Sequence, residues 1–337
     1  MIKEDSINNG ENEDIEFEKL LSASLSASSP APRPEIDSDS DFRSGYVALV
    51  GRPNAGKSTL LNRLVGEKIA AVSNKPQTTR HRIQGVITRE DGQIVLVDTP
   101  GVHKPGHLLN RRMMVAVHDA LASVNLVLLM RDASVSTGNG DRFVLDLVKQ
   151  SEQPAILVLN KIDKIHEKTE LLPLMEFYKN EYDWREVVPI SALKGSAIDN
   201  LLNQIVKHLP VGAPIFEEDE LTDQPMRQIV AEMVREKILQ TTGDELPYVT
   251  AVVTEKFDDE SDPQMVEIFC AIFVERSSQK GIIIGKGGAK LKEIGTKARA
   301  DIEKLLGKRA FLHLFVKVQE DWRNRETTLN DMGIRES

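Results

Sequence analysis

Short apolar runs alternate with longer mixed stretches over the first two-thirds of the chain. Runs of four or five consecutive apolar residues are typical of strands that are buried on both faces of a parallel sheet. The stretches between them are predicted helices. Strands that alternate with helices predict a doubly wound α/β domain. The expected strands cover 46–50, 94–97, 126–130, 155–159 and 187–190, and the expected helices include 111–123, 142–150 and 197–209.

The pattern changes after a cluster of helix and strand breakers. Pro210, Gly212 and Pro214 are followed by four acidic residues, which is the signature of a linker. Beyond it we predict a helix at 226–240 and two strands at 248–256 and 265–275. A glycine-rich turn, a second helix at 289–306 and a third strand at 311–318 follow. This order indicates a smaller α+β domain. The predicted boundaries are 1–44 for a tail, 45–212 and 225–323 for the two domains, 213–224 for the linker and 324–337 for a second tail.

Composition changes this picture mainly through the distribution of charge. The net charge is −9, but residues 1–44 hold eleven acidic and four basic residues and carry −7 of it, whereas residues 276–317 carry a local +8. The serine-rich, acidic first segment has too few apolar residues to offset its chain entropy, so we expect disorder there. No run approaches the ~20 uncharged apolar residues of a membrane span. The single cysteine, Cys270, lies in an apolar run and is expected in the core.

The strongest chemical signal follows the first predicted strand. Residues 51–58 match the phosphate-loop pattern of two glycines, a lysine and a hydroxyl, between a strand and a helix. Glycines let backbone amides turn toward phosphates at a helix N-terminus, which already favours anions. Lys57 is expected to contact the β- and γ-phosphates, and Ser58 to ligate Mg²⁺. The predicted loop comprises Gly51, Arg52, Pro53, Asn54, Ala55, Gly56, Lys57 and Ser58, followed by Thr59.

Three further motifs follow predicted strands and select the nucleotide. Asp98 can hold the Mg²⁺ shell, and the Gly101 amide can sense the γ-phosphate. Asp163 can accept two hydrogen bonds from guanine, and a buried Asp163 carboxylate would be left unpaired by adenine. The three motifs are Asp98-Thr99-Pro100-Gly101, Asn160-Lys161-Ile162-Asp163 and Ser191-Ala192, whose backbone can offer an amide to the guanine O6. The sequence therefore predicts a Mg²⁺-dependent site for GTP and GDP.

The second domain contains a candidate nucleic-acid clamp. Gly285-Lys286-Gly287-Gly288 is a Gly-x-x-Gly turn between an apolar run and a basic helix. In KH domains such a turn clamps about four single-stranded nucleotides. The helix after it has an apolar face, while Lys290 and Lys292 lie off that face and can meet phosphates. The order of elements and the local positive charge support a KH type II domain, with Phe311, Phe315 and Trp322 as core or boundary residues rather than stacking platforms. An acidic tail could compete with RNA for this basic region.

Together these motifs resemble the Era family of GTPases from Gly45 to about Asp321. Residues 77–82 resemble the first switch segment of that family, so Thr78 or Thr79 is implied to complete the Mg²⁺ shell in the GTP state. His81 and His103 are expected to be loop residues rather than acid–base catalysts. Val102 stands where Ras-like GTPases place a glutamine, which implies slow intrinsic hydrolysis. Asn54 matches a position that holds an activating K⁺ in related GTPases, or it simply caps the loop.

The resemblance implies a bacterial ribosome-assembly GTPase. Its KH domain would recognise the 3′ end of 16S ribosomal RNA during maturation of the 30S subunit, with the nucleotide state acting through the linker. A cytoplasmic monomer is expected, with a peripheral contact to the anionic inner membrane ranked below RNA. Two alternatives stay open: a GTPase of membrane traffic or metal transport, which would not need residues 281–309, and a non-enzymatic RNA-binding module, which would not need Lys57, Ser58 and Asp98.

Overall fold

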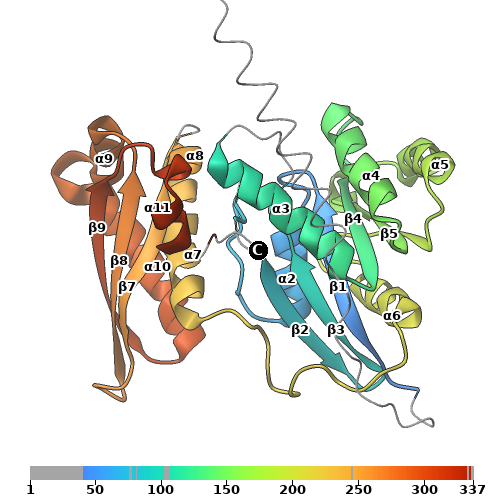
Figure 1. Ribbon diagram of the computed structural model, residues 1–337, viewed down its shortest axis with the longest axis horizontal. Coiled ribbons are helices and arrows are strands. Elements are labelled where there is room, and N and C mark those ends of the chain that lie inside the picture. Colours follow the sequence, from blue (N-terminus) through green and yellow to red (C-terminus); the bar gives the residue numbers. More distant parts are fainter. Residues whose placement is uncertain are drawn as a thin grey trace, which may run out of the picture.

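The computed structural model describes residues 41–75, 78–80, 82–101, 107–243, 246–331 and 334. Two sheets lie side by side, each with helices packed on it (Figure 1). A six-stranded sheet belongs to the N-terminal domain, and a three-stranded sheet belongs to the C-terminal domain. No helix within the described ranges is long and apolar enough to cross a membrane. The predicted tail at 1–44 falls almost entirely outside the described residues.

The first sheet has the order β2-β3-β1-β4-β5-β6 and is parallel except for β2, which pairs antiparallel with β3. Helices α2 and α6 pack on one face and α3, α4 and α5 on the other, so the predicted doubly wound domain is confirmed. The strands are β1 (Arg43–Gly51), β2 (Ile83–Arg89), β3 (Gly92–Asp98), β4 (Leu126–Asp132), β5 (Ala155–Asn160) and β6 (Glu186–Pro189), and the helices are α2 (Lys57–Val65), α3 (Leu108–Ser123), α4 (Asn139–Ser151), α5 (Leu171–Glu181) and α6 (Ile198–His208).

Sequence analysis missed strand β2 and helix α5 in this domain. Strand β2 carries Gln84, Thr88 and Arg89 among its apolar residues, so it has no continuous apolar run. It also lies at the edge of the sheet, where a strand is buried less completely. The predicted linker covers part of that edge, because the Val86 amide donates to the Leu221 carbonyl at 2.9 Å and the Thr222 hydroxyl to the Gln84 carbonyl at 2.6 Å.

The second sheet has the order β7-β8-β9, with β7 and β8 antiparallel and β8 and β9 parallel. Sequence analysis missed two of its helices: residues 281–284, taken only as an apolar run, end helix α9, and the start of the predicted strand 248–256 belongs to the short helix α8. The elements are α7 (Met226–Thr241), α8 (Leu246–Val249), β7 (Ala251–Asp258), β8 (Met265–Val274), α9 (Ser277–Ile284), α10 (Ala289–Leu306), β9 (Arg309–Val318) and α11 (Glu326–Asp331).

The two faces of this second sheet differ. One face is covered by helices and buries Cys270, as predicted; burial raises the pKa of its thiol to about 11. On the other face Phe311 and Phe315 are 52% and 45% exposed, so their placement as core or boundary residues was wrong. Trp322 is fully buried, as expected, and packs with helix α3 of the first domain.

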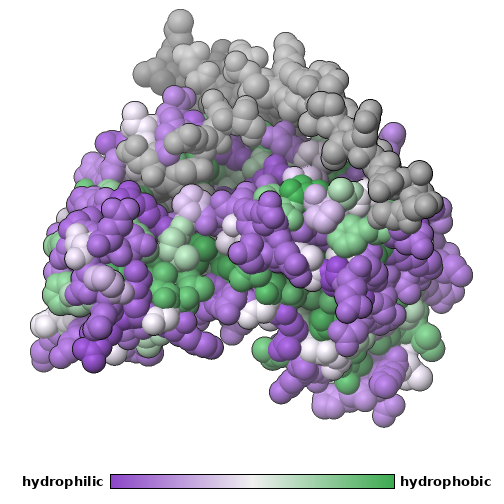
Figure 2. All heavy atoms as spheres, turned by 90° about the horizontal axis from the view of Figure 1, so that it is seen from below, coloured by the Kyte–Doolittle hydropathy of each residue, from purple (hydrophilic) through white to green (hydrophobic). Residues whose placement is uncertain are grey.

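The C-terminal stretch taken for a tail also takes part in this contact. Helix α11 lies between the two domains in Figure 1, and its Leu329 is fully buried with Leu109 and Met113 of α3. Arg112 of α3 donates to the Ile334 carbonyl at 2.7 Å and to Asn330 at 2.9 Å. Apolar packing and hydrogen bonds therefore join α11 to the first domain. Figure 2 shows the apolar surface between the two halves of the molecule from another side.

Candidate nucleotide site and nucleic-acid interface

The phosphate-loop motif forms the turn between β1 and α2, as its pattern predicts. Asn54 and Gly56 have left-handed backbone conformations, with φ of 64° and 103°, and Gly56 is the N-cap of α2. Lys57 is only 6% exposed, and its ammonium donates to the Gly51 carbonyl at 3.1 Å and the Arg52 carbonyl at 3.4 Å. Burial lowers the pKa of Lys57, while the Asp98 charge opposes that shift. The ammonium is thus held inside the loop, where bound phosphate oxygens would reach it.

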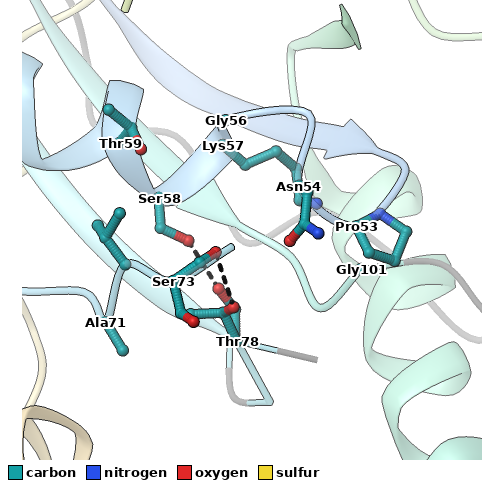
Figure 3. Close-up of a pocket in the computed structure, with 12 residues that line it drawn as sticks. Pro53, Asn54, Gly56, Lys57, Ser58, Thr59, Ala71, Ser73, Thr78 and Gly101 are labelled. Carbon is teal, nitrogen blue, oxygen red and sulfur yellow. Dashed lines mark hydrogen bonds between the residues drawn. The ribbon is translucent and has the colours of Figure 1, made fainter. Parts of the chain in front are cut away.

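Three oxygen-bearing side chains, Ser58, Thr79 and Asp98, meet beside this lysine. Figure 3 shows Ser58 and Lys57 in the cleft that the phosphate loop lines. The Ser58 hydroxyl donates to Asp98 Oδ2 at 2.8 Å, and Thr79 Oγ1 lies 2.7 Å from Ser58 Oγ and 3.2 Å from the same carboxylate oxygen. Asp98 is fully buried, burial raises its pKa, and the Lys57 charge together with these hydroxyls opposes the shift. Its Oδ1 is buried without a hydrogen-bond partner among the described residues. Hydroxyl and carboxylate oxygens with an unpaired buried acceptor fit Mg²⁺.

The structure separates the two candidate threonines of the switch segment. Thr79 is 5% exposed and belongs to the group with Ser58 and Asp98. The Thr78 hydroxyl instead donates to the Lys75 carbonyl at 2.7 Å. Geometry therefore favours Thr79 at the metal position and leaves Thr78 in a backbone role.

The predicted guanine motifs lie together at the ends of β5 and β6. The Asn160 side chain donates to the Ala55 carbonyl at 2.8 Å and accepts the Ala192 amide at 2.9 Å, so it ties the phosphate loop to the third motif. Lys161 pairs with Asp132 at 2.6 Å. Asp163 is exposed, not buried as the selectivity argument assumed, and it accepts a hydrogen bond from the Ser191 hydroxyl. A bound base would cover this carboxylate.

Several predicted nucleotide ligands have structural partners. The Arg52 guanidinium pairs with Asp141 of α4 at 2.9 Å, and the Thr99 hydroxyl donates to the Leu49 carbonyl at 2.7 Å. The Asn54 amide donates to the Asn74 carbonyl at 2.7 Å. Pro53, Gly56, Thr59 and Gly101 line the same cleft as Lys57 and Ser58, and Ala55 and Pro100 are buried beside them. The predicted loop residues Gln77, His81, Val102 and His103 lie outside the described residues.

The candidate RNA clamp is open to solvent, unlike the buried nucleotide site. Gly285, Gly287 and Gly288 all have positive φ, at 71°, 59° and 81°, and Gly288 is the N-cap of α10. Their positive φ favours glycine. A Cβ atom on Gly287 or Gly288 would meet no atom within 4 Å, so the surface around both residues is open. Within the described ranges, no ion pair involves Lys286, Lys290 or Lys292. Their charges therefore remain available for phosphate.

Sequence analysis missed a polar interface between the two domains. Four charged residues of α7 are buried. Arg235 and Glu236 contact the segment between α2 and β2, and Lys237 pairs with Asp301 of α10. The only sequence signal was charge on every side of a helix that also carries a continuous apolar pattern. The residues are Glu232, Arg235, Glu236 and Lys237 on α7, with Lys68 and Arg80 opposite them.

The first domain has a phosphate loop, a metal-binding carboxylate and an Asn-Lys-x-Asp segment at strand ends, which define a Ras-like GTPase. The second domain, with its glycine clamp, is a KH domain. Residues 46–161 match the model of the 50S ribosome-binding GTPase family, and residues 245–323 match the KH domain family. One similar crystal structure is Era with MgGDPNP and nucleotides 1506–1542 of 16S ribosomal RNA, at 41% identity and a TM-score of 0.84. Another is a point variant of Aquifex aeolicus Era bound to GDP·AlF4⁻, at 42% identity and a TM-score of 0.83.

Each of these alignments covers 87% of this chain and 99% of the other. The chain belongs to the Era family of GTPases. The resemblance inferred from its motifs is thereby confirmed, as is the combination of a Ras-like domain with a KH domain. The two alternatives inferred from sequence, a membrane-traffic or transport GTPase and a non-enzymatic RNA-binding module, each account for one domain alone.

Proposed function

We propose that this protein binds and hydrolyses GTP, recognises the 3′ end of 16S ribosomal RNA through its KH domain and acts in assembly of the 30S subunit. The group formed by Ser58, Thr79 and Asp98 carries the first part, because its buried unpaired oxygen suits a metal ion between phosphates. The RNA part is supported by the open glycine clamp at 285–288 and by the RNA in the similar Era complex.

At the nucleotide site each residue has a separate task. Lys57 neutralises charge on the β- and γ-phosphates, and the α2 N-terminus and loop amides orient them. Ser58, Thr79 and Asp98 would hold Mg²⁺, which would supply positive charge to stabilise the phosphates. Asp163 would select guanine, while Asn160 holds the base-binding segment against the phosphate loop. The Gly101 amide would sense the γ-phosphate. Positioning and charge, rather than a protein acid or base, carry the reaction.

Thr79 links the nucleotide state to the rest of the molecule. In the GTP state the metal and the γ-phosphate would hold it beside Ser58 and Asp98, and loss of the γ-phosphate would remove that constraint. The KH domain would then bind RNA differently in the two states. This extends the role given to the linker at 213–224, since residues of the switch segment itself contact the KH domain.

Binding of a short RNA that matches the 16S 3′ end tests this proposal. Affinities are measured with GDP and with a non-hydrolysable GTP analogue, and a scrambled RNA is the control. We expect selective binding that the GTP analogue strengthens. Equal binding of both RNAs would leave a GTPase with a generic basic surface and would contradict the assembly role.

Two features of hydrolysis follow from single residues. Val102 can neither donate to nor accept from water, so we expect slow intrinsic turnover. Asn54 Nδ2 donates to the Asn74 carbonyl at 2.7 Å, which fixes the side chain at the edge of the phosphate loop. Its other polar atom, Oδ1, is an amide oxygen, the kind of ligand that K⁺ takes. A K⁺ ion there would supply charge that an arginine finger provides elsewhere, an effect worth ~10³–10⁵ in rate. Equal GTPase rates in K⁺ and Na⁺ would exclude this role for Asn54.

We further propose a cytoplasmic monomer with a weak peripheral contact to anionic membrane. The support is the local charge of +8 over 276–317, which attracts anionic lipid within a Debye length. The same charge attracts RNA, so the two ligands should compete. Vesicle co-sedimentation with and without the 16S 3′-end RNA checks this; binding that persists at saturating RNA would place the lipid contact elsewhere.

A further inference from the structure

Helix α7 belongs to the KH domain, yet its charged residues turn toward the GTPase domain. Glu236 is 2% exposed, and its carboxylate accepts the Lys68 ammonium at 2.7 Å and the Val72 backbone amide at 3.0 Å. Gln240, one turn further along, donates to Glu236 at 2.9 Å and to the Val72 carbonyl at 3.3 Å. Both polar groups of the Val72 backbone are therefore held by α7. Lys68 and Val72 lie in the segment that leads from α2 to the metal site.

Arg235 makes the second contact, next to the metal position. It is 1% exposed, and its guanidinium donates to the Glu232 carboxylate and to the Thr78 backbone carbonyl. The next residue is Thr79, whose hydroxyl lies 2.7 Å from Ser58 Oγ and 3.2 Å from Asp98. One peptide unit thus separates a KH-domain side chain from the threonine that would ligate Mg²⁺.

Helix α10 connects the same contacts to the RNA clamp. It starts directly after Gly288, and Asp301 near its other end accepts ion pairs from Lys68 at 2.7 Å and Lys237 at 2.5 Å. The stretch of helix from Gly288 to Asp301 is about 20 Å of a rigid element. Movement of the clamp would therefore be transmitted to Lys68 and Glu236.

We propose that Arg235 and Glu236 are positioning residues of the GTPase site. They fix the backbone ahead of the switch segment, at Val72, and within it, at Thr78, and so place Thr79 at the metal. The KH domain contributes to the GTP-bound site from outside the GTPase fold. RNA that shifts α7 and α10 would also shift Thr79 and so change the affinity for Mg²⁺·GTP. By linkage, Mg²⁺·GTP would change the affinity for RNA by the same factor. The second part rests on the proposed function.

The test measures nucleotide and metal binding without RNA. Arg235→Lys keeps a charge for Glu232 but replaces the fork that also reaches Thr78, and Glu236→Gln keeps shape while weakening its hold on Lys68 and Val72. Each variant is titrated with Mg²⁺ in the presence of a fluorescent GTP analogue and of fluorescent GDP. We expect about tenfold more Mg²⁺ for half-maximal binding of the GTP analogue, the loss of roughly one charge-assisted hydrogen bond, with unchanged GDP binding.

Arg89→Lys and Glu267→Gln are matched controls, because both residues form ion pairs away from this interface. Wild-type Mg²⁺ dependence in both test variants would overturn the proposal, and so would equal weakening of GDP and GTP-analogue binding, which indicates a general structural defect. RNA affinities are then measured in both nucleotide states, where the variants should lose most of the wild-type preference. A wild type without that preference would overturn nucleotide gating, whereas the Mg²⁺ titration would still decide the role of Arg235 and Glu236.

Discussion

The nucleotide site and the candidate RNA clamp are built in opposite ways. At the nucleotide site, Lys57 and Asp98 are buried, and the polar side chains already hydrogen-bond one another. At the clamp, glycines with positive φ present open backbone, and Lys286 within it and Lys290 just after it have no ion pairs in the described part of the chain. One site is built by burying charge, and the other by leaving backbone and charge accessible.

This difference has an energetic consequence. A buried charge destabilises the fold until a ligand compensates for its lost hydration. An exposed lysine costs the fold little and gains affinity that salt screens. Substitutions of buried charges at the nucleotide site should therefore weaken nucleotide binding without a matching loss of stability. Substitutions at the clamp should weaken RNA binding and leave stability almost unchanged.

The largest effect is expected for Lys57→Ala. It removes the charge proposed to contact two phosphates, so affinity for GTP and GDP should fall on the order of 1,000-fold. The free energy of unfolding of the nucleotide-free protein should change far less, because the relief of no longer burying an ammonium offsets the lost hydrogen bonds and the lost charge beside Asp98. Calorimetric titration and chemical unfolding measure the two quantities. A variant that loses stability in proportion to its affinity would contradict the separation described above.

Gly288→Asp tests the clamp. A carboxylate beside the bound phosphates, on a backbone with φ of 81°, should weaken binding of the 16S 3′-end RNA about 30-fold, or ~2 kcal/mol. Gly288→Asn is the matched control, since asparagine has the same shape, tolerates the left-handed region and lacks the charge. We expect at most a small effect from it. Equal losses in both variants would show that space or backbone strain, rather than charge, controls the clamp.

Sequence reasoning succeeded where a motif coincided with a strand end. The phosphate loop and the Asp98, Asn160 and Ser191 motifs all lie where the apolar runs placed them, because the carboxyl ends of parallel strands meet at one edge. It failed where a contact depends on backbone groups or on the partner domain. Arg235 binds the Thr78 carbonyl, which every residue type possesses, so no pattern at position 78 could reveal it.

The choice between Thr78 and Thr79 shows the same limit. Adjacent hydroxyls are equivalent in a sequence, and only the path of the backbone directs one of them to Ser58 and Asp98. Asp163 shows the converse, because its position after β5 was predicted correctly while its burial was not. Exposure depends on how the rest of the chain closes over a residue, and that information is absent from a short motif.

A smaller effect is expected for Asp98→Asn, which should weaken metal binding but make the metal-free protein more stable. Burial raises the pKa of Asp98 in the folded state above its ordinary value of 3.8, which applies to the unfolded state. The folded state therefore binds the proton of Asp98 more tightly than the unfolded state does. Wild-type stability without Mg²⁺ and nucleotide should consequently fall as pH rises from about 4 through the raised pKa. The asparagine variant should lack this fall and be more stable at a pH of about 7.5 by about 1–2 kcal/mol.

Urea unfolding at several pH values in a metal chelator measures this difference. The variant should also lose the extra stability that Mg²⁺ and the GTP analogue give the wild type. Asp91→Asn is the control, because Asp91 is exposed and the Arg89 hydrogen bond lowers its pKa. Asp91 therefore contributes stability that is lost as pH falls, and Asp91→Asn should remove that opposite trend. Identical pH profiles for wild type and Asp98→Asn would mean that burial of this carboxylate costs the fold nothing.

The smallest expected effect concerns the open face of the KH sheet. Phe311 is 52% exposed, so Phe311→Ser should change the free energy of unfolding by less than about 1 kcal/mol. Ile302→Ala on the covered face, where the side chain is fully buried, should cost ~2–5 kcal/mol. The clamp precedes the helix that carries Ile302, so the pair also shows whether RNA affinity follows KH stability. If Phe311→Ser weakens RNA binding while leaving stability intact, bases contact this face, and the accessible surface of the clamp extends beyond its glycines and lysines.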